Sequence, residues 1–261
     1  MSRIETHHLL FFVDFNVSRE SSFFPLFSRY IYSLCNDLSS LIYTTNSVLE
    51  DFQADGVVYL ELRTTPRAIP SADITKVDYV QTTLDCISKF NASSSMKTNL
   101  ILSIDRRNDL PIALEVVDLA IKFQNQGVVG IDLCGDPTAV EVAIFRPAFE
   151  KAKKNDLKIT IHFAEAPQSS TAQELWTLLS YNPDRIGHVI HVPEDVKEEI
   201  VKRKLGLELC LSCNIHSKMV TGTYSDHHFG WWRETGCPIA LSVGPSPPYS
   251  HPNLRRILPV C

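Results

Sequence analysis

The chain has 261 residues, of which 44% are hydrophobic and 21% are charged, and its formal net charge is −5. This composition is typical of one large globular domain with a full core, and it argues against intrinsic disorder. The negative charge and the absence of long basic runs argue against a surface for nucleic-acid polymers, although a local pocket for one phosphate remains open.

The cysteines and the apolar stretches indicate the compartment. The seven cysteines are odd in number and mostly lie inside apolar runs, which is typical of buried free thiols in a reducing compartment. The longest apolar stretch near the start, 9–13, is too short for a membrane span and lacks a basic segment before it. We therefore expect a cytoplasmic protein with no membrane partner, and we favour a monomer.

Short apolar runs alternate with amphipathic segments along the chain. Helical spacing of apolar residues predicts a helix around 77–87, and Asp109 with Pro111 predicts the cap and first turn of a helix that runs to about residue 126. Further helices are expected at about 139–154, 171–180 and 194–204. The predicted strands are 57–65, 99–105, 128–134, 158–163, 185–190, 206–212 and 238–243.

This alternation predicts an α/β fold. Strands that are apolar on both faces and separated by helices indicate a parallel sheet, and the number of units favours a TIM-type (β/α)8 barrel. A doubly wound sheet is the alternative. Neither a G-x-G-x-x-G nor a G-x-x-x-x-G-K-[ST] segment follows a predicted strand, so the usual dinucleotide or triphosphate cradle is not expected.

Polar residues collect where the predicted strands end. In a (β/α) barrel these ends open on one face, which carries the active site. Polar residues also cap helices and fill turns, so a purely structural interpretation stays open. The clusters are 63–67, 105–107, 134–136, His162 with Glu165, His188, and Cys213 with Asn214.

His162 and Glu165, with His188 about one strand-helix unit later, are the strongest candidates for chemistry. Metal-assisted hydrolysis needs a ligand, a proton carrier and an electrostatic partner, which these residue types can supply. A lone His162 would more often be a satisfied interior histidine, and the nearby Glu165 shifts that balance. Cys210 and Cys213 form a C-x-x-C pair without a second Cys or His pair, which makes a poor zinc ribbon.

Several motifs resemble the adenosine deaminase superfamily of zinc-dependent barrels. They are 157–167, 184–188, 132–136 and 210–214. More narrowly, 59–67 and 227–231 look like the adenosine deaminase-like branch, which acts on N6-methyl-AMP. The resemblance covers roughly 23–242, and we expect a barrel domain at 23–243.

The resemblance implies roles for particular residues and one Zn²⁺ per subunit. His162 would be a zinc ligand, Glu165 would carry a proton between a zinc-bound water and purine N1, and His188 would orient the attacking hydroxide. Gly135 would approach the purine, where a Cβ would obstruct contact. The ribose phosphate of a purine nucleoside monophosphate would be bound by Thr64, Thr65, Pro66, Arg67 and Asp105.

The chain departs from the family pattern near both ends. The family's first strand ends in H-x-H, whereas this chain has His7 in the first ligand position and Leu9 in the second. The family has two aspartates where this chain has Val243 and Gly244. We therefore expect a divergent segment at 1–22, a Pro-rich irregular tail at 244–261, and an incomplete barrel whose zinc ligands fall short of three.

Three functions remain open at this point. The first is zinc-dependent hydrolytic deamination of a 6-aminopurine nucleoside or nucleotide, above all N6-methyl-AMP to IMP. The second is a catalytically inactive, metal-poor product with at most a binding role. The third is another amidohydrolase that acts on a C–N bond.

Overall fold

The computed structural model describes residues 32–137, 139, 141–216 and 218–241. Within these residues, one sheet of seven parallel strands follows the chain order from β1 to β7. The strands are β1 (Tyr59–Thr64), β2 (Lys97–Asp105), β3 (Val128–Cys134), β4 (Lys158–Phe163), β5 (Arg185–His188), β6 (Gly206–Leu209) and β7 (Ile239–Leu241).

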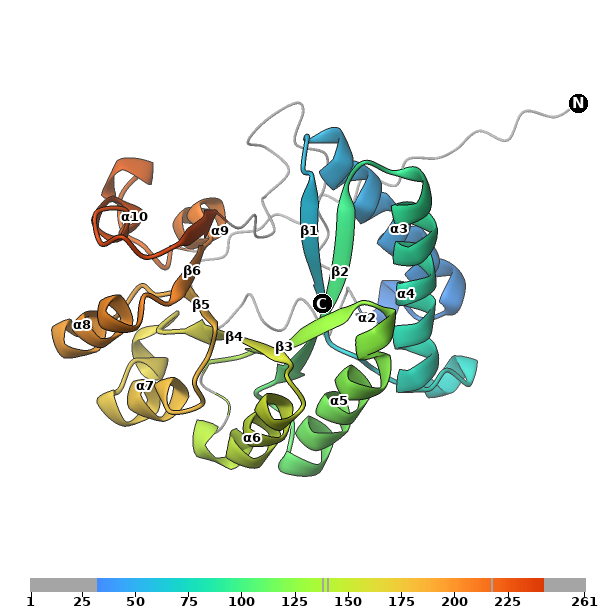
Figure 1. The fold of residues 1–261 in the computed structure, drawn as a ribbon, viewed down its shortest axis with the longest axis horizontal. Coiled ribbons are helices and arrows are strands. Elements are labelled where there is room, and N and C mark those ends of the chain that lie inside the picture. Colours follow the sequence, from blue (N-terminus) through green and yellow to red (C-terminus); the bar gives the residue numbers. More distant parts are fainter. Residues whose placement is uncertain (1–31, 138, 140, 217, 242–261) are drawn as a thin grey trace, which may run out of the picture.

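The helices pack outside this curled sheet (Figure 1). The longer ones are α3 (Leu38–Ala54), α4 (Lys76–Ser93), α5 (Leu110–Phe123), α6 (Arg146–Lys154), α7 (Ala172–Leu179) and α8 (Glu194–Arg203). Shorter ones are α2 (Tyr32–Leu34), α9 (Leu211–His216) and α10 (Phe229–Trp232), with 3-10 turns at Pro70–Ala72, Gln124–Gln126, Val142–Phe145, Pro167–Ser169 and Tyr224–Asp226. Among the residues described, no helix combines the length and apolar character that crossing a membrane requires.

The predicted parallel α/β architecture is confirmed in the form of an incomplete barrel. The predicted caps of α5 also form, because the Asp109 carboxylate accepts the Ile112 backbone N–H at 3.0 Å and Pro111 lies in the first turn. Segments 1–22 and 244–261 lie outside the described residues, as does His7, so their expected character stays a prediction.

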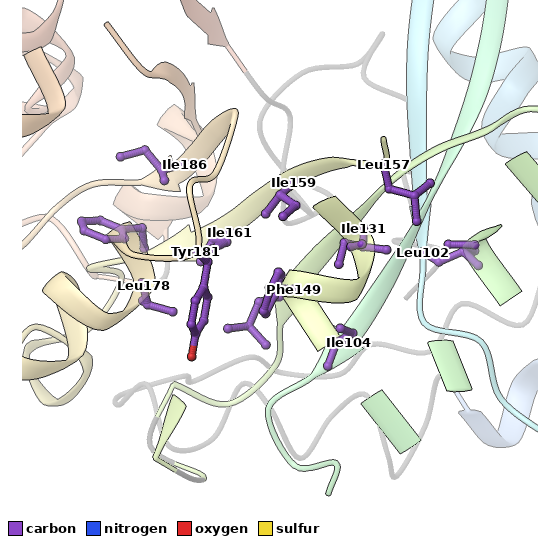
Figure 2. Packing of buried hydrophobic residues seen from close by; sticks show 14 of the residues in the cluster. Leu102, Ile104, Ile131, Phe149, Leu157, Ile159, Ile161, Leu178, Tyr181 and Ile186 are labelled. Atoms are coloured by element: carbon purple, nitrogen blue, oxygen red, sulfur yellow. The ribbon is translucent and has the colours of Figure 1, made fainter. Parts of the chain in front are cut away.

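The main core lies between the outer face of the sheet and the helices. Ile131 and Leu133 of β3 and Ile159 and Ile161 of β4 are buried there with Phe149 of α6. Figure 2 shows Ile131, Ile159, Ile161 and Phe149 beside other apolar side chains of neighbouring elements, Leu178 and Tyr181 among them. Burying apolar surface is the main favourable term in folding, so this layer holds the strands in register.

The inner face of the sheet differs from the prediction that both faces are apolar. Side chains alternate along a strand, so Asp132 lies opposite Ile131 and Leu133, and Thr160 and His162 alternate with apolar neighbours. These polar side chains contact one another inside the curve. The interior is therefore a polar layer, and its charges come from strands far apart in the sequence.

Two strands end earlier than predicted. β5 stops at His188 because His188 and Val189 have φ angles of 62° and 48°. A strand cannot continue through left-handed backbone, even where the residues are apolar. β6 stops at Leu209 because the segment from Leu211 forms α9 instead.

Candidate active site

The turns after β4 and β5 are joined to each other and have unusual backbone geometry. Ala164 has φ of 50°, and it lies between β4 and Glu165. The carbonyl of Ala164 accepts the backbone N–H groups of Ile190 at 3.1 Å and His191 at 3.0 Å. Left-handed backbone at a residue other than glycine costs about 1–3 kcal/mol, and such strain clusters at functional sites.

His162, Glu165 and His188 come together at these strand ends. His188 Nε2 lies 3.5 Å from Glu165 Oε1, and both side chains are buried. The ring centroids of His162 and His188 are 5.2 Å apart. The structure thus brings two imidazoles and one carboxyl group into one place, as an acid-base site requires.

Asp132 orients His162 from the neighbouring strand. His162 Nδ1 lies 3.1 Å from Asp132 Oδ1 and 3.0 Å from the Leu133 carbonyl oxygen. Both groups accept, so Nδ1 carries a proton and, in the neutral ring, the lone pair is on Nε2. Burial lowers the pKa of His162, but the charge of Asp132 outweighs it and leaves that pKa above the ordinary value.

Asp132 itself is completely buried and keeps its charge through its partners. Burial raises the pKa of its carboxyl group, but His162 and Arg63 outweigh this effect and hold that pKa below the usual value. Ser103 Oγ donates to Asp132 Oδ2 at 3.1 Å, and Arg63 Nη1 lies 3.9 Å from Oδ1. We did not predict Asp132 as a site residue, although a lone carboxylate within an apolar strand was a signal in the sequence.

Asn214 and His228 contact His188 directly, and His227 contacts it through Asn214. One end of the Asn214 amide lies 2.9 Å from His188 Nδ1, and its other end lies 3.1 Å from His227 Nε2. His228 Nε2 donates to the His188 carbonyl oxygen at 2.6 Å. We did not predict His227 or His228 as site residues, because their contacts with this site depend on tertiary structure.

Charged side chains cross the interior of the curved sheet. Arg63 of β1 bonds to Glu208 of β6, and Arg185 of β5 bonds to Glu61 of β1. Arg185 Nε also lies 3.0 Å from Glu208 Oε1, and Thr160 Oγ1 donates to Glu208 Oε2 at 3.1 Å. These pairs connect the first strand of the described sheet to its sixth, and through Arg63 they reach Asp132.

Gly135 and Asp105 form a second small cluster, beyond the end of β3. A Cβ on Gly135 would lie 2.5 Å from Asp105 Oδ1, and Gly135 has φ of 93°, so both space and backbone favour glycine. The Asp105 carboxylate accepts from Arg107 Nε at 2.9 Å and from the Arg107 backbone N–H at 2.8 Å. Asp105 is thus held by an arginine and lies against the Gly135 backbone.

The predicted phosphate-binding segment is divided between two sides of the sheet. Thr64 is buried on the helix side, where its Oγ1 lies 2.8 Å from the Tyr79 hydroxyl. Thr65 Oγ1 lies 3.7 Å from Cys134 Sγ, next to Gly135. Pro66 is buried, and Arg67 donates to the carbonyl oxygen of Cys35. Of this segment, Thr65 contacts the strand end that precedes Gly135.

The residues that the structure describes do not fit a metal centre on their own. In that part of the chain no three His, Cys, Asp or Glu side chains form a group that could hold a metal ion. A catalytic zinc normally has three protein ligands. His162 supplies a suitable nitrogen, but Glu165 and His188 face each other instead of completing a set with it.

Comparison of the sequence with known proteins gives a family match. The adenosine deaminase family model matches residues 17–254. The N6-methyl-AMP deaminase-L of Xenopus laevis is 36% identical over 219 residues, which cover 82% of this chain and 62% of that protein. The chain therefore spans less than two thirds of that relative's length.

Two solved structures of an Arabidopsis protein share the fold and contain nucleotides. The Arabidopsis ADAL structure complexed with IMP is 33% identical with a TM-score of 0.81, and the match covers 87% of this chain and 68% of that one. The same protein complexed with GMP gives a TM-score of 0.82 at 33% identity, with 88% of this chain and 68% of that chain covered.

Proposed function

The chain belongs to the adenosine deaminase family, and on that premise we propose that it hydrolyses the C6–N bond of a 6-aminopurine nucleoside monophosphate. The expected reaction converts N6-methyl-AMP and water into IMP and methylamine. We assign it to a barrel domain at 23–243. The observation that carries the proposal is the convergence of His162, Glu165 and His188 at the ends of two adjacent strands.

Glu165 is suited to move the protons of this reaction. Addition of water to purine C6 is easier once N1 has accepted a proton, and loss of the amine requires a proton on the exocyclic nitrogen. An ionised carboxylate can accept one proton from the attacking water and pass it to N1, and can then carry the second proton of that water from the new C6 hydroxyl group to the leaving amine. Glu165 is buried and has His188 as its partner, so water does not screen these transfers.

Gly135, Asp105 and Thr65 support a place for the substrate next to this pair. The Asp105 carboxylate fills the place that a Gly135 side chain would take, and we propose that the purine ring lies against the other side of the Gly135 backbone. The Asp105 carboxylate is occupied by Arg107, so we propose that it shapes the site instead of contacting a phosphate. Arg67 is the proposed phosphate partner, because a guanidinium group carries a permanent positive charge and several N–H donors that suit a phosphate dianion.

The lack of a complete metal-ligand set among the described residues favours one alternative function. The family resemblance implies zinc, with His162 as a ligand, but the described residues do not complete a ligand set. For this reason the steps above involve only the side chains of this chain. The alternative is a protein that binds purine nucleotides without turning them over. Another amidohydrolase activity remains the third candidate, and it lacks support from Thr65 and Arg67.

One experiment separates these functions. The purified 261-residue chain is incubated with adenosine, AMP and N6-methyl-AMP in parallel, while released ammonia and methylamine and the bound metal are measured. We expect methylamine from N6-methyl-AMP at a higher rate than ammonia from the other two. If none of the three releases an amine while calorimetry detects IMP binding, the binding function is correct and the proposed deamination is wrong.

A further inference from the structure

We propose that His227 and Asn214 are positioning residues that fix the tautomer of His188, with the proton of the neutral imidazole on Nε2. In this form His188 presents an N–H to Glu165 and cannot accept a hydrogen bond at that nitrogen. The role that follows for His188 in catalysis rests on the proposed function. The tautomer itself follows from hydrogen bonds alone.

The chain of hydrogen bonds begins at the first turn of α10. The backbone N–H of Phe229 donates to His227 Nδ1 at 3.0 Å. A backbone N–H can only donate, so His227 Nδ1 must hold a lone pair. His227 is 4% exposed, and burial lowers the pKa of its imidazole below the usual value, as does the nearby His188. A neutral ring with a lone pair on Nδ1 carries its proton on Nε2.

This proton decides the orientation of the Asn214 amide. His227 Nε2 lies 3.1 Å from one end of the amide, and its N–H needs an acceptor there. An amide oxygen and an amide nitrogen have nearly the same shape, so the hydrogen-bond network assigns them. If the amide nitrogen faced His227, both ring nitrogens would have to accept, and the ring would have no proton. The amide oxygen therefore faces His227.

The same amide then fixes the proton of His188. The structure places Asn214 Oδ1 2.9 Å from His188 Nδ1 and Nδ2 toward His227, and the proton on His227 requires these two amide ends to be exchanged. After the exchange the NH₂ group donates to His188 Nδ1. His188 Nδ1 therefore holds a lone pair, and the proton of the neutral ring is on Nε2. This nitrogen lies 3.5 Å from Glu165 Oε1, so the ring presents an N–H and not a lone pair to the carboxylate. Asn214 is fully buried, which leaves no bulk water to compete for these bonds.

The consequence for Glu165 is that the neighbouring ring presents a donor to it. An N–H on His188 Nε2 attracts the carboxylate oxygen, whereas the opposite tautomer would place a lone pair against that oxygen. Because the Phe229 N–H is part of the backbone, the arrangement has a fixed donor that no change of pH removes.

The test uses the whole chain with ¹⁵N-labelled histidine. Long-range ¹H–¹⁵N spectra distinguish a protonated ring nitrogen from an unprotonated one, and His188→Gln identifies the His188 signals. We expect the wild-type protein to show His188 protonated on Nε2 and unprotonated on Nδ1. A proton on Nδ1 would overturn the proposal. This measurement needs neither turnover nor a stable variant.

A pair of variants tests the direction of control. In Asn214→Asp the carboxylate accepts from both rings, so we expect the His188 proton to move to Nδ1 and kcat to fall by about 10- to 100-fold with KM nearly unchanged. Asn155→Asp is the control: it makes the same amide-to-carboxylate change at the end of α6, away from His188, and should leave the His188 signals as in the wild type. An unmoved proton in folded Asn214→Asp would contradict the proposal.

The two proposals fail in different ways. The expected His188 tautomer without any turnover would leave the hydrogen-bond chain intact and refute the proposed deamination. Turnover of N6-methyl-AMP with the proton on His188 Nδ1 would support the deamination and refute the control of His188 by Asn214 and His227.

Discussion

Asp132 holds His162 across two adjacent strands, with 3.1 Å between the carboxylate Oδ1 and the ring Nδ1. Both residues lie on the inner face of the sheet, and Asp132 pairs in register with Thr160, two residues before His162. The ring therefore has a fixed orientation and presents Nε2 to the interior. A buried carboxylate that orients a histidine at an active site commonly affects activity without contacting substrate.

We predict that Asp132→Asn lowers kcat/KM for N6-methyl-AMP by about 10- to 100-fold, because the neutral amide orients His162 less strongly. Ser103→Ala is the matched control. Ser103→Ala removes a hydrogen bond to the other carboxylate oxygen of Asp132 but leaves the charge in place, so kcat/KM should fall much less. Steady-state kinetics on both variants decide the matter, and equal losses would show that the charge of Asp132 is unimportant.

His228 should make stability depend on pH. Burial and the neighbouring His227 lower its pKa to about 4, whereas the unfolded chain has an ordinary histidine pKa. The unfolded state then binds more protons between these values, so the free energy of unfolding falls as pH decreases from about 6.5 to 4, by about 2–3 kcal/mol from this residue. Above pH 6.5 this contribution is fully present.

The matched variant for this prediction is His228→Gln, which keeps an N–H donor for the His188 carbonyl oxygen but cannot take up a proton. Urea unfolding at pH 7, 5.5 and 4.5 should show a flatter pH dependence for the variant. Parallel curves for the two proteins would mean that His228 is not held neutral by its surroundings.

Some of these features could be predicted from sequence and others could not. β3 and β4 coincide with the predicted 128–134 and 158–163 because apolar runs bounded by polar residues define buried strands. The predicted strand 185–190 was too long, because Val189 is apolar but has left-handed backbone. Nothing local to Asn214 indicates its contacts with His188 and His227, since these join segments far apart in the chain.

The left-handed turn at Ala164 gives a prediction about stability. Ala164→Gly removes a left-handed penalty of about 1–2 kcal/mol, which offsets about 0.8 kcal/mol for the lost methyl group and the greater freedom of the unfolded chain. We expect a change in the free energy of unfolding close to zero.

Ala120→Gly is the control, because Ala120 is equally buried but lies within α5. It should destabilise the protein by about 1–2 kcal/mol, since helix propensity and methyl burial are both lost. Chemical denaturation measures both variants. A loss at Ala164 as large as that at Ala120 would show that the backbone there is not strained.

The charges that cross the sheet interior should be important for stability. Arg63→Met leaves Glu208 and Asp132 buried with one cation fewer, and we expect a loss of about 3–5 kcal/mol. Lys202→Met breaks a pair with Glu199 on the surface of α8 and should cost at most about 1 kcal/mol. Thermal and urea unfolding compare them, and similar small losses would contradict a structural role for Arg63.

Replacement of Glu165 by Gln tests the central claim most directly. The amide keeps the shape of the side chain but cannot carry a proton, so methylamine release from N6-methyl-AMP should fall by about 10²- to 10⁴-fold. Binding of IMP, measured by calorimetry, should stay close to that of the wild type. Unchanged methylamine release by Glu165→Gln would contradict the proton-carrying role on which the proposed function depends.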